Sequence, residues 1–400
     1  MKRHWKVAVV KDTSRPMLGG HGLHVAFRGL PGVEIVAHVD ANTENLGPKL
    51  AQTGAKRHYA TCAAMLEHET PDIVVLCSRH PGDHLEQVRM VAEKGGHLYC
   101  EKPVSALLTE ADEMVRLAEA NRIMLGVAHP ARYDLGFLTM KRLVESGEIG
   151  TPLTVIGRGK CDHRGGGEDL IVLGTHILDL QTFFFGAPRR VMAEVLTGGR
   201  PATLADAGQT TLVEPVGPAL GDEVFASFQF PGGVRGLFES RVGLFDAKRV
   251  LSGQGDGVRH MGLSVIGTQG VLSLRFDDLG VRRRPLLISR LPCFPENEAR
   301  FEEVPLTETR SIPGAEPLDY ALCGQPDVPR AQWFLEAGRF AAWDLICAIE
   351  EGRQPVSNIG NARLALEMIH GIYAAHLSGT TVAFPLADRK HPLASDFLST

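Results

Sequence analysis

The chain has 400 residues, 44 % of them hydrophobic and 22 % charged, with a formal net charge of −5. This is the composition of a soluble globular protein, and the length is enough for two domains that each bury a core. The basic residues form no long run and no stretch approaches the roughly 20 apolar residues that span a bilayer, so we expect neither nucleic-acid nor membrane partners.

Cysteine usage and the start of the chain both bear on the compartment. The first apolar run, Val7–Val10, ends at Lys11 and is too short for the core of a secretion signal. The seven cysteines are widely spaced and include no C-x-x-C pair, which fits reduced thiols better than disulfides. We therefore expect a cytoplasmic protein. Cys161 and His163, even with His176 and Asp179, match no familiar zinc spacing, so no metal is expected.

Short apolar runs alternate with amphipathic segments over the first 130 residues, which predicts a doubly wound parallel sheet covered on both faces. We assign residues 1–130 to this α/β domain, of the Rossmann type that binds dinucleotides. The expected strands are Val7–Val10, Ile35–Val39, Ile73–Leu76 and His97–Cys100, and the expected helices are His84–Lys94 and Glu110–Asn121.

Beyond a last short strand at Met124–Val127 and a helix at Leu135–Ser146, longer strands joined by turns predict a large, mostly antiparallel sheet. We assign residues 131–400 to this α+β domain, for substrate binding and oligomerisation. One helix, residues 169–185, interrupts the strands, residues 276–330 form an irregular insertion, and two helices close the fold within residues 331–378. The expected strands are Leu153–Gly157, Val224–Phe230, Val234–Phe238, Leu263–Ile266 and Val271–Leu274.

A glycine cluster follows the first strand, where a dinucleotide fold brings its backbone to the pyrophosphate. Gly20 and Gly22 are the expected contacts, although no intact G-x-G-x-x-G is present. Asp40 lies about twenty residues beyond Gly20, the spacing of a ribose ligand. A carboxylate there favours NAD over NADP because it repels a 2′-phosphate. Asp40 as a helix N-cap stays open as the alternative.

Two further groups of residues suggest chemistry. Lys102, in Glu101-Lys102-Pro103 after a strand, can bind a substrate oxygen, and His176 can exchange a hydroxyl proton. Asp179 is three residues from His176, on the same helix face, and can hold a second substrate hydroxyl. The alternative is a capping histidine with a structural salt bridge at Asp179. The remaining expected contacts are Ser78, His84 and Glu101 for the cofactor, and His163, Arg164 and Arg132 for the substrate. Packing or ion-pair roles for His84 and Arg132 stay open.

In combination these segments resemble the Gfo/Idh/MocA family of sugar and polyol oxidoreductases. The resemblance implies a Rossmann domain followed by an open-faced sheet that builds dimers or tetramers, with Lys102 and His176 catalytic and Asp179 contacting substrate. It rests on Pro31-Gly32-Val33-Glu34, Val39-Asp40, Asp72-Ile73-Val74, Asp83-His84, Gly95-Gly96-His97, Glu101-Lys102-Pro103, Glu145-Ser146-Gly147-Glu148-Ile149-Gly150, Gly174-Thr175-His176 with Asp179, and Ile266-Gly267-Thr268-Gln269-Gly270.

The chain departs from the family pattern at two places. A longer turn, Lys11–Leu18, replaces the first fingerprint glycines, and Val172 stands where many members carry an aspartate one turn before the histidine. Asp169 or Glu168 is the candidate replacement. The leading hypothesis is NAD-dependent oxidation of a secondary alcohol on a sugar, glycoside or cyclic polyol. The alternatives are a redox-neutral, NAD-using glycoside hydrolase or lyase of the same family, and a non-catalytic ligand sensor.

Overall fold

A computed structural model describes residues 4–15, 21–207, 214, 216–243, 261–276, 286–290, 301–306 and 310–394. The chain divides into two compact units. The first unit contains Met1–Tyr133 and Thr309–Arg363, and the second contains Asp134–Glu308 and Leu364–Thr400. Among the described residues, no helix is long and apolar enough to cross a membrane.

The first unit is built on a six-stranded parallel sheet in the order β3-β2-β1-β4-β5-β6. All four residues of β4 are buried, as expected where both faces of a parallel sheet are covered. This order reverses direction at β1 and β4, which is the arrangement of a dinucleotide-binding fold. The strands are β1 (Trp5–Val10), β2 (Val33–Val39), β3 (Arg57–Tyr59), β4 (Ile73–Leu76), β5 (His97–Cys100) and β6 (Leu125–Val127).

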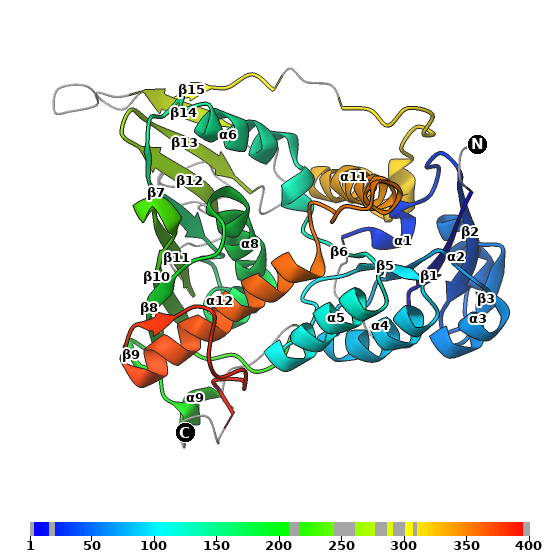
Figure 1. Cartoon of the computed structure of the whole chain (residues 1–400), viewed down its shortest axis with the longest axis horizontal. Helices are drawn as coiled ribbons and strands as arrows, with labels where there is room; N and C mark the ends of the chain where they lie inside the picture. The colour runs from blue at the N-terminus through cyan, green and yellow to red at the C-terminus, as the bar shows by residue number, and fades with distance from the viewer. Residues whose placement is uncertain are drawn as a thin grey trace. The chain divides into compact units, whose positions relative to one another are not determined.

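Helices cover both faces of this sheet. In Figure 1, α3, α4 and α5 lie on one face, and α1 and α11 lie on the other. The helices of this unit are α1 (Leu23–Ala26), α2 (Leu46–Thr53), α3 (Cys62–His68), α4 (His84–Glu93), α5 (Leu108–Ala120) and α11 (Pro329–Glu351), with short 3-10 turns η1 (Pro81–Asp83), η2 (Pro130–Tyr133) and η4 (Tyr320–Cys323).

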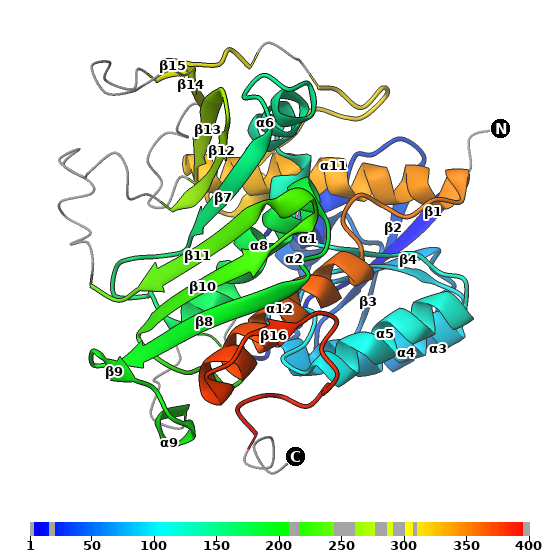
Figure 2. The same ribbon diagram turned by 60° about the vertical axis from the view of Figure 1, so that its left-hand side comes forward.

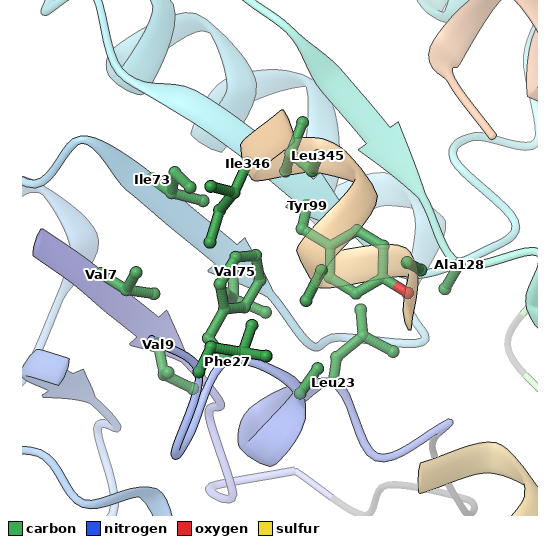
Figure 3. Close-up of a cluster of buried hydrophobic side chains, with 14 of the residues drawn as sticks. Val7, Val9, Leu23, Phe27, Ile73, Val75, Tyr99, Ala128, Leu345 and Ile346 are labelled. Carbon is green, nitrogen blue, oxygen red and sulfur yellow. The ribbon is translucent and has the colours of Figure 1, made fainter. Parts of the chain in front are cut away.

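The core of the first unit includes a helix from far along the chain. Figure 3 shows Leu345 and Ile346 of α11 beside Val75 and Tyr99 of the sheet, and all four side chains are almost fully buried. The predicted single boundary at residue 130 therefore differs from the observed grouping. The apolar face of α11 completes the first core, so residues 309–363 return to the N-terminal unit.

The second unit contains a ten-stranded sheet in the order β15-β14-β13-β12-β7-β11-β10-β8-β16, with β9 paired to β8. Among the strand pairs of the described residues, β7 with β11 is the parallel one, so the expected mostly antiparallel sheet is confirmed. The strands are β7 (Pro152–Arg158), β8 (Arg190–Thr197), β9 (Arg200–Pro201), β10 (Glu223–Gln229), β11 (Arg235–Arg241), β12 (Gly262–Gly267), β13 (Gly270–Arg275), β14 (Leu287–Arg290), β15 (Glu302–Glu303) and β16 (Val382–Ala383).

Burial alternates along these strands, because one face of the sheet packs against helices. Figure 2 shows β7, β11, β10 and β8 side by side with α8 behind them. Close packing of α8 is possible because Gly157 and Gly236 carry no side chain at the contact. The helices here are α6 (Leu135–Glu145), α7 (Gly167–Val172), α8 (Gly174–Phe185), α9 (Leu204–Ala207) and α12 (Ile359–Ser378, residues up to Arg363 belonging to the first unit), with the 3-10 turn η3 (Pro231–Gly233).

Two local predictions need correction. The expected single helix over residues 169–185 is two helices that meet at Leu173, and a Cβ at the following Gly174 would lie 3.1 Å from Phe238. The helix backbone therefore lies close to Phe238 of the sheet at the point where α7 ends and α8 begins. Within the insertion expected to be irregular, β14 pairs antiparallel with β13. Ile288 of this strand is buried, as is Leu286 just before it, so this part of the insertion joins the core.

Candidate functional site

The turn between β1 and α1 carries the residues expected to approach a pyrophosphate. Gly22 precedes α1 with φ of 74°, in the left-handed region that favours glycine. Gly20 lies outside the described residues. His21, next to Gly22, is buried. Its ring packs edge-on against Phe334 of α11, with 4.6 Å between the ring centroids. His21 was not predicted as a site residue, because its partners Glu101 and Phe334 are far away in the chain.

His21 connects this turn to the carboxyl end of β5. Its Nδ1 lies 2.5 Å from Glu101 Oε1, and both side chains are buried. Burial disfavours the charged form of each group, but nearby His21, Arg79 and Lys102 lower the pKa of Glu101. Burial also lowers the pKa of His21. The imidazole and the carboxyl therefore form a buried hydrogen bond, and the pair anchors the glycine turn to the Glu101-Lys102 segment.

Glu101 and Lys102 follow β5 directly, and both are almost fully buried. The peptide bond between Lys102 and Pro103 is cis. Among the described residues, Glu101 Oε2 is a buried acceptor without a hydrogen-bond partner. Such an atom is costly unless a ligand or water donates to it. The thiol of the preceding Cys100 has its pKa raised well above its ordinary value by burial, which argues against a nucleophile there.

Asp40 lies where predicted, just beyond the carboxyl end of β2, but it is not an isolated anion. Its Oδ1 accepts from the backbone N–H groups of Thr13 and Asn42, both at 2.9 Å. Its Oδ2 accepts from Thr13 Oγ1 and from Lys49 Nζ, both at 2.8 Å. Burial raises the pKa of this carboxyl, but these hydrogen bonds outweigh it and lower the pKa to about 2. Sequence spacing found Asp40 and missed its partners Thr13 and Lys49.

Ser78 and His84 lie close together and share a hydrogen-bond network. Ser78 Oγ donates to Asp83 Oδ2 at 2.7 Å. The two ring nitrogens of buried His84 lie 3.0 Å from Val104 O and 2.9 Å from Ser78 O. These contacts tie the end of β4 to the segment after Lys102, which is the packing role left open for His84. A cofactor contact at either residue stays a prediction.

The residues of the first unit fit a dinucleotide. Gly22, Asp40, Ser78 and Glu101 follow four strands, β1, β2, β4 and β5, whose carboxyl ends share one edge of the parallel sheet. Open α/β sheets bind ligands at this edge. Glu101 Oε2 offers a buried acceptor for a ligand hydroxyl, and Gly22 supplies the left-handed backbone at the start of α1.

In the second unit, a glycine run positions the helices that carry the other predicted residues. A Cβ at Gly165 would lie 2.4 Å from the Arg241 carbonyl carbon, and one at Gly167 would lie 2.2 Å from Leu220 O. Side chains are therefore excluded at both positions, and the backbone runs directly against the end of β11 and the segment that precedes β10. This packing fixes the start of α7, and α8 follows it after one residue.

Asp169 and Glu168 are the two candidate replacements for the family aspartate at Val172. Both carboxylates accept hydrogen bonds from other segments of the second unit. Asp169 Oδ2 accepts from the backbone N–H of Lys160 at 2.6 Å and from Ser240 Oγ at 2.9 Å. Its Oδ1 is 3.3 Å from Lys160 Nζ. Glu168 Oε1 accepts from the backbone N–H of Glu214 at 2.8 Å. These contacts link α7 to the ends of β7 and β11, which is a structural role for Asp169.

His176 and Asp179 are both buried on the first turns of α8, three residues apart as predicted. The other expected substrate contacts have different surroundings. The His163 side chain is 80 % exposed, and Arg164 forms a two-pronged ion pair with the adjacent Asp162. Buried Arg132, in the first unit, donates to Val356 O at 3.1 Å. Substrate binding by these residues stays a prediction.

Among the described residues, no three histidine, cysteine or acidic side chains are grouped as a metal site requires. Cys161, the thiol weighed as a metal ligand, is buried, and burial raises its pKa to about 11. A thiol with a raised pKa is a poor metal ligand, because the thiolate is the ligating form.

Comparison with known proteins gives two family matches. Residues 19–129 match an oxidoreductase family described by an NAD-binding Rossmann fold, and residues 137–273 match a GFO/IDH/MocA C-terminal domain. A D-apiose dehydrogenase from Paraburkholderia graminis is 34 % identical over 178 residues, which is 42 % of this chain and 47 % of that protein. A myo-inositol 2-dehydrogenase from Thermotoga maritima is 26 % identical over 59 % of this chain and 72 % of its own length. The match thus spans about half of the first relative.

Solved structures share the fold over nearly the whole chain. A levoglucosan dehydrogenase in complex with NADH and levoglucosan superposes with a TM-score of 0.68 at 18 % identity, covering 96 % of this chain and 100 % of that one. An oxidoreductase from Agrobacterium radiobacter in complex with NAD+, L-tartaric acid and magnesium gives a TM-score of 0.67 at 18 % identity, covering 95 % and 98 %. At this identity the likeness shows the fold.

Proposed function

The chain belongs to the Gfo/Idh/MocA family of oxidoreductases, and on that premise we propose that it oxidises a secondary alcohol of a sugar, glycoside or cyclic polyol, or catalyses the reverse reduction. The relatives that support this substrate class are named for D-apiose and myo-inositol. Both are polyhydroxylated small molecules, so the proposed substrate is a carbohydrate or polyol of that kind.

The observation that carries the proposal is the buried Glu101–Lys102 pair at the carboxyl end of β5. A lysine is almost never buried without a functional or structural partner, because desolvation of an ammonium group is costly. Lys102 is only 2 % exposed, and it follows a strand whose end belongs to the ligand-binding edge of the sheet. A cation in that position stabilises negative charge on the oxygen of a substrate.

We propose the following roles for the residues of this chain. Lys102 binds the reacting oxygen and stabilises the charge that develops on it. His176 accepts the hydroxyl proton during oxidation and returns it during reduction. Asp179 accepts a hydrogen bond from a second substrate hydroxyl. A bound nicotinamide coenzyme would supply the acceptor for the hydride of the alcohol carbon. That hydride and the hydroxyl proton accepted by His176 are the two hydrogens removed from the alcohol.

We propose NAD as the preferred coenzyme, with NADP less favoured, and Gly20, Gly22, Asp40, Ser78, His84 and Glu101 as its contacts. A carboxylate after β2 accepts hydrogen bonds from ribose hydroxyls and repels a 2′-phosphate. The fully buried position of Asp40 beyond β2 supports this role. Glu101 supports its own role through the acceptor oxygen Oε2 described above.

Self-association and a reducing compartment complete the proposal. Met192 and Phe225 are exposed large apolar side chains, 51 % and 44 % accessible, on one face of the antiparallel sheet. Exposed apolar side chains on an uncovered sheet face support a homodimer or homotetramer. The six cysteines within the described residues are all thiols, which supports a cytoplasmic location. A solution mass equal to one chain would refute the assembly.

The experiment that tests the function begins with calorimetric binding of NAD and NADP to the full chain. A panel of sugars, polyols and glycosides is then followed by NADH absorbance in the near ultraviolet. We expect coenzyme binding and NADH formation with one substrate class. Coenzyme binding with a cleaved glycoside but no NADH would instead favour a redox-neutral hydrolase or lyase. Binding of neither coenzyme would refute the proposed function.

A further inference from the structure

The carboxylate of Asp40 has no acceptor capacity left in the observed network. Two backbone N–H groups donate to its Oδ1, and Thr13 Oγ1 and Lys49 Nζ donate to its Oδ2. A carboxylate offers about four lone-pair sites, so all of them are used. A ribose diol can bind Asp40 only by replacing a donor. The side-chain donors, Thr13 and Lys49, can move, whereas the backbone donors are fixed.

The ammonium group of Lys49 also has all of its hydrogen-bonding capacity used. It extends from α2, and its Nζ lies 2.8 Å from Asp40 Oδ2, 2.8 Å from Thr13 Oγ1 and 2.7 Å from Asn42 O. These three acceptors match the three N–H donors of an ammonium group. The lysine side chain is 18 % exposed, so the ion pair is largely shielded from water and salt.

The ion pair changes the charge that a coenzyme meets after β2. An unpaired carboxylate repels a 2′-phosphate, but a carboxylate with an ammonium at 2.8 Å has little net charge at the distance of a ligand. The neighbouring His38 adds no positive charge near neutral pH, because burial lowers its pKa to about 4. Lys11 also interacts electrostatically with Asp40, and burial lowers the pKa of Lys11. Lys49 is the lysine whose ammonium contacts the carboxylate directly, so it sets the charge at this contact.

We infer that Lys49 is the specificity-determining residue that lets this chain accept NADP as well as NAD, by neutralising Asp40. This inference rests on the proposed function, since it concerns the coenzyme of the same site. Asp40 alone would favour NAD over NADP, and with Lys49 bound to it this preference becomes small. Removing the ammonium exposes the charge of Asp40 to a 2′-phosphate and returns one lone pair to the ribose hydroxyls of NAD.

The test is the ratio of the dissociation constants for NADP and NAD, measured by calorimetry on the full-length protein. We expect the wild-type ratio to lie within about tenfold of one, and Lys49→Met to raise it by about tenfold or more through weaker NADP binding. Asp40→Asn leaves the ammonium without its anionic partner, so the ratio should shift toward NADP. Thermal unfolding of each variant establishes that it is folded.

A matched control is Lys56→Met. Lys56 is an exposed lysine of the same unit, seven residues further along, and its partner is Glu34. This variant should leave the ratio unchanged. If Lys49→Met also leaves it unchanged, or if the wild type binds NAD but excludes NADP, the inference is overturned while the proposed function stands. If the wild type binds neither coenzyme, both are refuted.

Discussion

Gly157 lies in β7 where α8 crosses the sheet, and we expect Gly157→Ala to destabilise the second unit. An ideal Cβ at this position would lie 2.2 Å from Ile177 Cγ2 and 2.9 Å from Gln181 Nε2. Carbon atoms in good contact are about 3.5–4.0 Å apart, so α8 must withdraw by more than about 1 Å. Ile177 is fully buried and its Cγ2 is a short branch, so the side chain has little room to turn away.

The expected magnitude follows from two opposing effects. Forcing an extra carbon into a packed core costs about 1–3 kcal/mol. Replacing glycine by alanine also restricts the unfolded chain, which returns about 0.4–1 kcal/mol. We therefore expect a net loss of about 1–2 kcal/mol in the free energy of unfolding. His176 directly precedes Ile177 on α8, so catalytic efficiency in the proposed reaction should fall as well.

Urea unfolding of four proteins measures the effect: wild type, Gly157→Ala, Ile177→Leu and the double variant. Leucine has no Cγ2 branch at Cβ, so it relieves the contact, and alone it should cost less than about 1.5 kcal/mol. The double variant should recover about 1 kcal/mol relative to the sum of the single changes. As a control, Gly47→Ala adds a Cβ with no atom within 4 Å and should not destabilise. Additive single changes, or a loss below about 0.5 kcal/mol for Gly157→Ala, would refute the packing argument.

Lys102→Met and His176→Asn should each reduce turnover at least about hundredfold while leaving coenzyme affinity within a few-fold, as measured by steady-state kinetics and calorimetry. Turnover that persists in either variant would contradict the role assigned to that residue. His38 is buried and its pKa is lowered from 6.5 to about 4, so the unfolded chain binds this proton at higher pH than the folded protein does. Stability from this group is therefore lost as the pH falls, by about 2 kcal/mol between about pH 7 and about pH 5. His38→Leu should flatten that part of the urea-unfolding profile against pH, and an unchanged slope would show that His38 does not cause it.

Local sequence was sufficient for the elements whose residues carry their own signal. The strands β4 and β5 begin and end at the predicted residues. Asp72 precedes the apolar run of β4, and Gly96 and Glu101 bound the run of β5 on both sides. The position of Lys102 after β5 followed from the same boundary. Asp40 was found by its spacing from the glycine turn, since the length of a strand–turn–helix–strand unit is nearly constant.

Tertiary structure decided which side chains pair and which core each helix completes. The periodicity of α11 predicted a helix but could not tell which sheet its apolar face would cover, because burial is the same physical gain against either core. Glu101 and His21 are 80 residues apart, and Thr13 and Asp40 are 27 apart. Such contacts form only when the sheet brings the ends of β1, β2 and β5 to one edge, so the charge state of the candidate site followed from the fold rather than from the spacing of its residues.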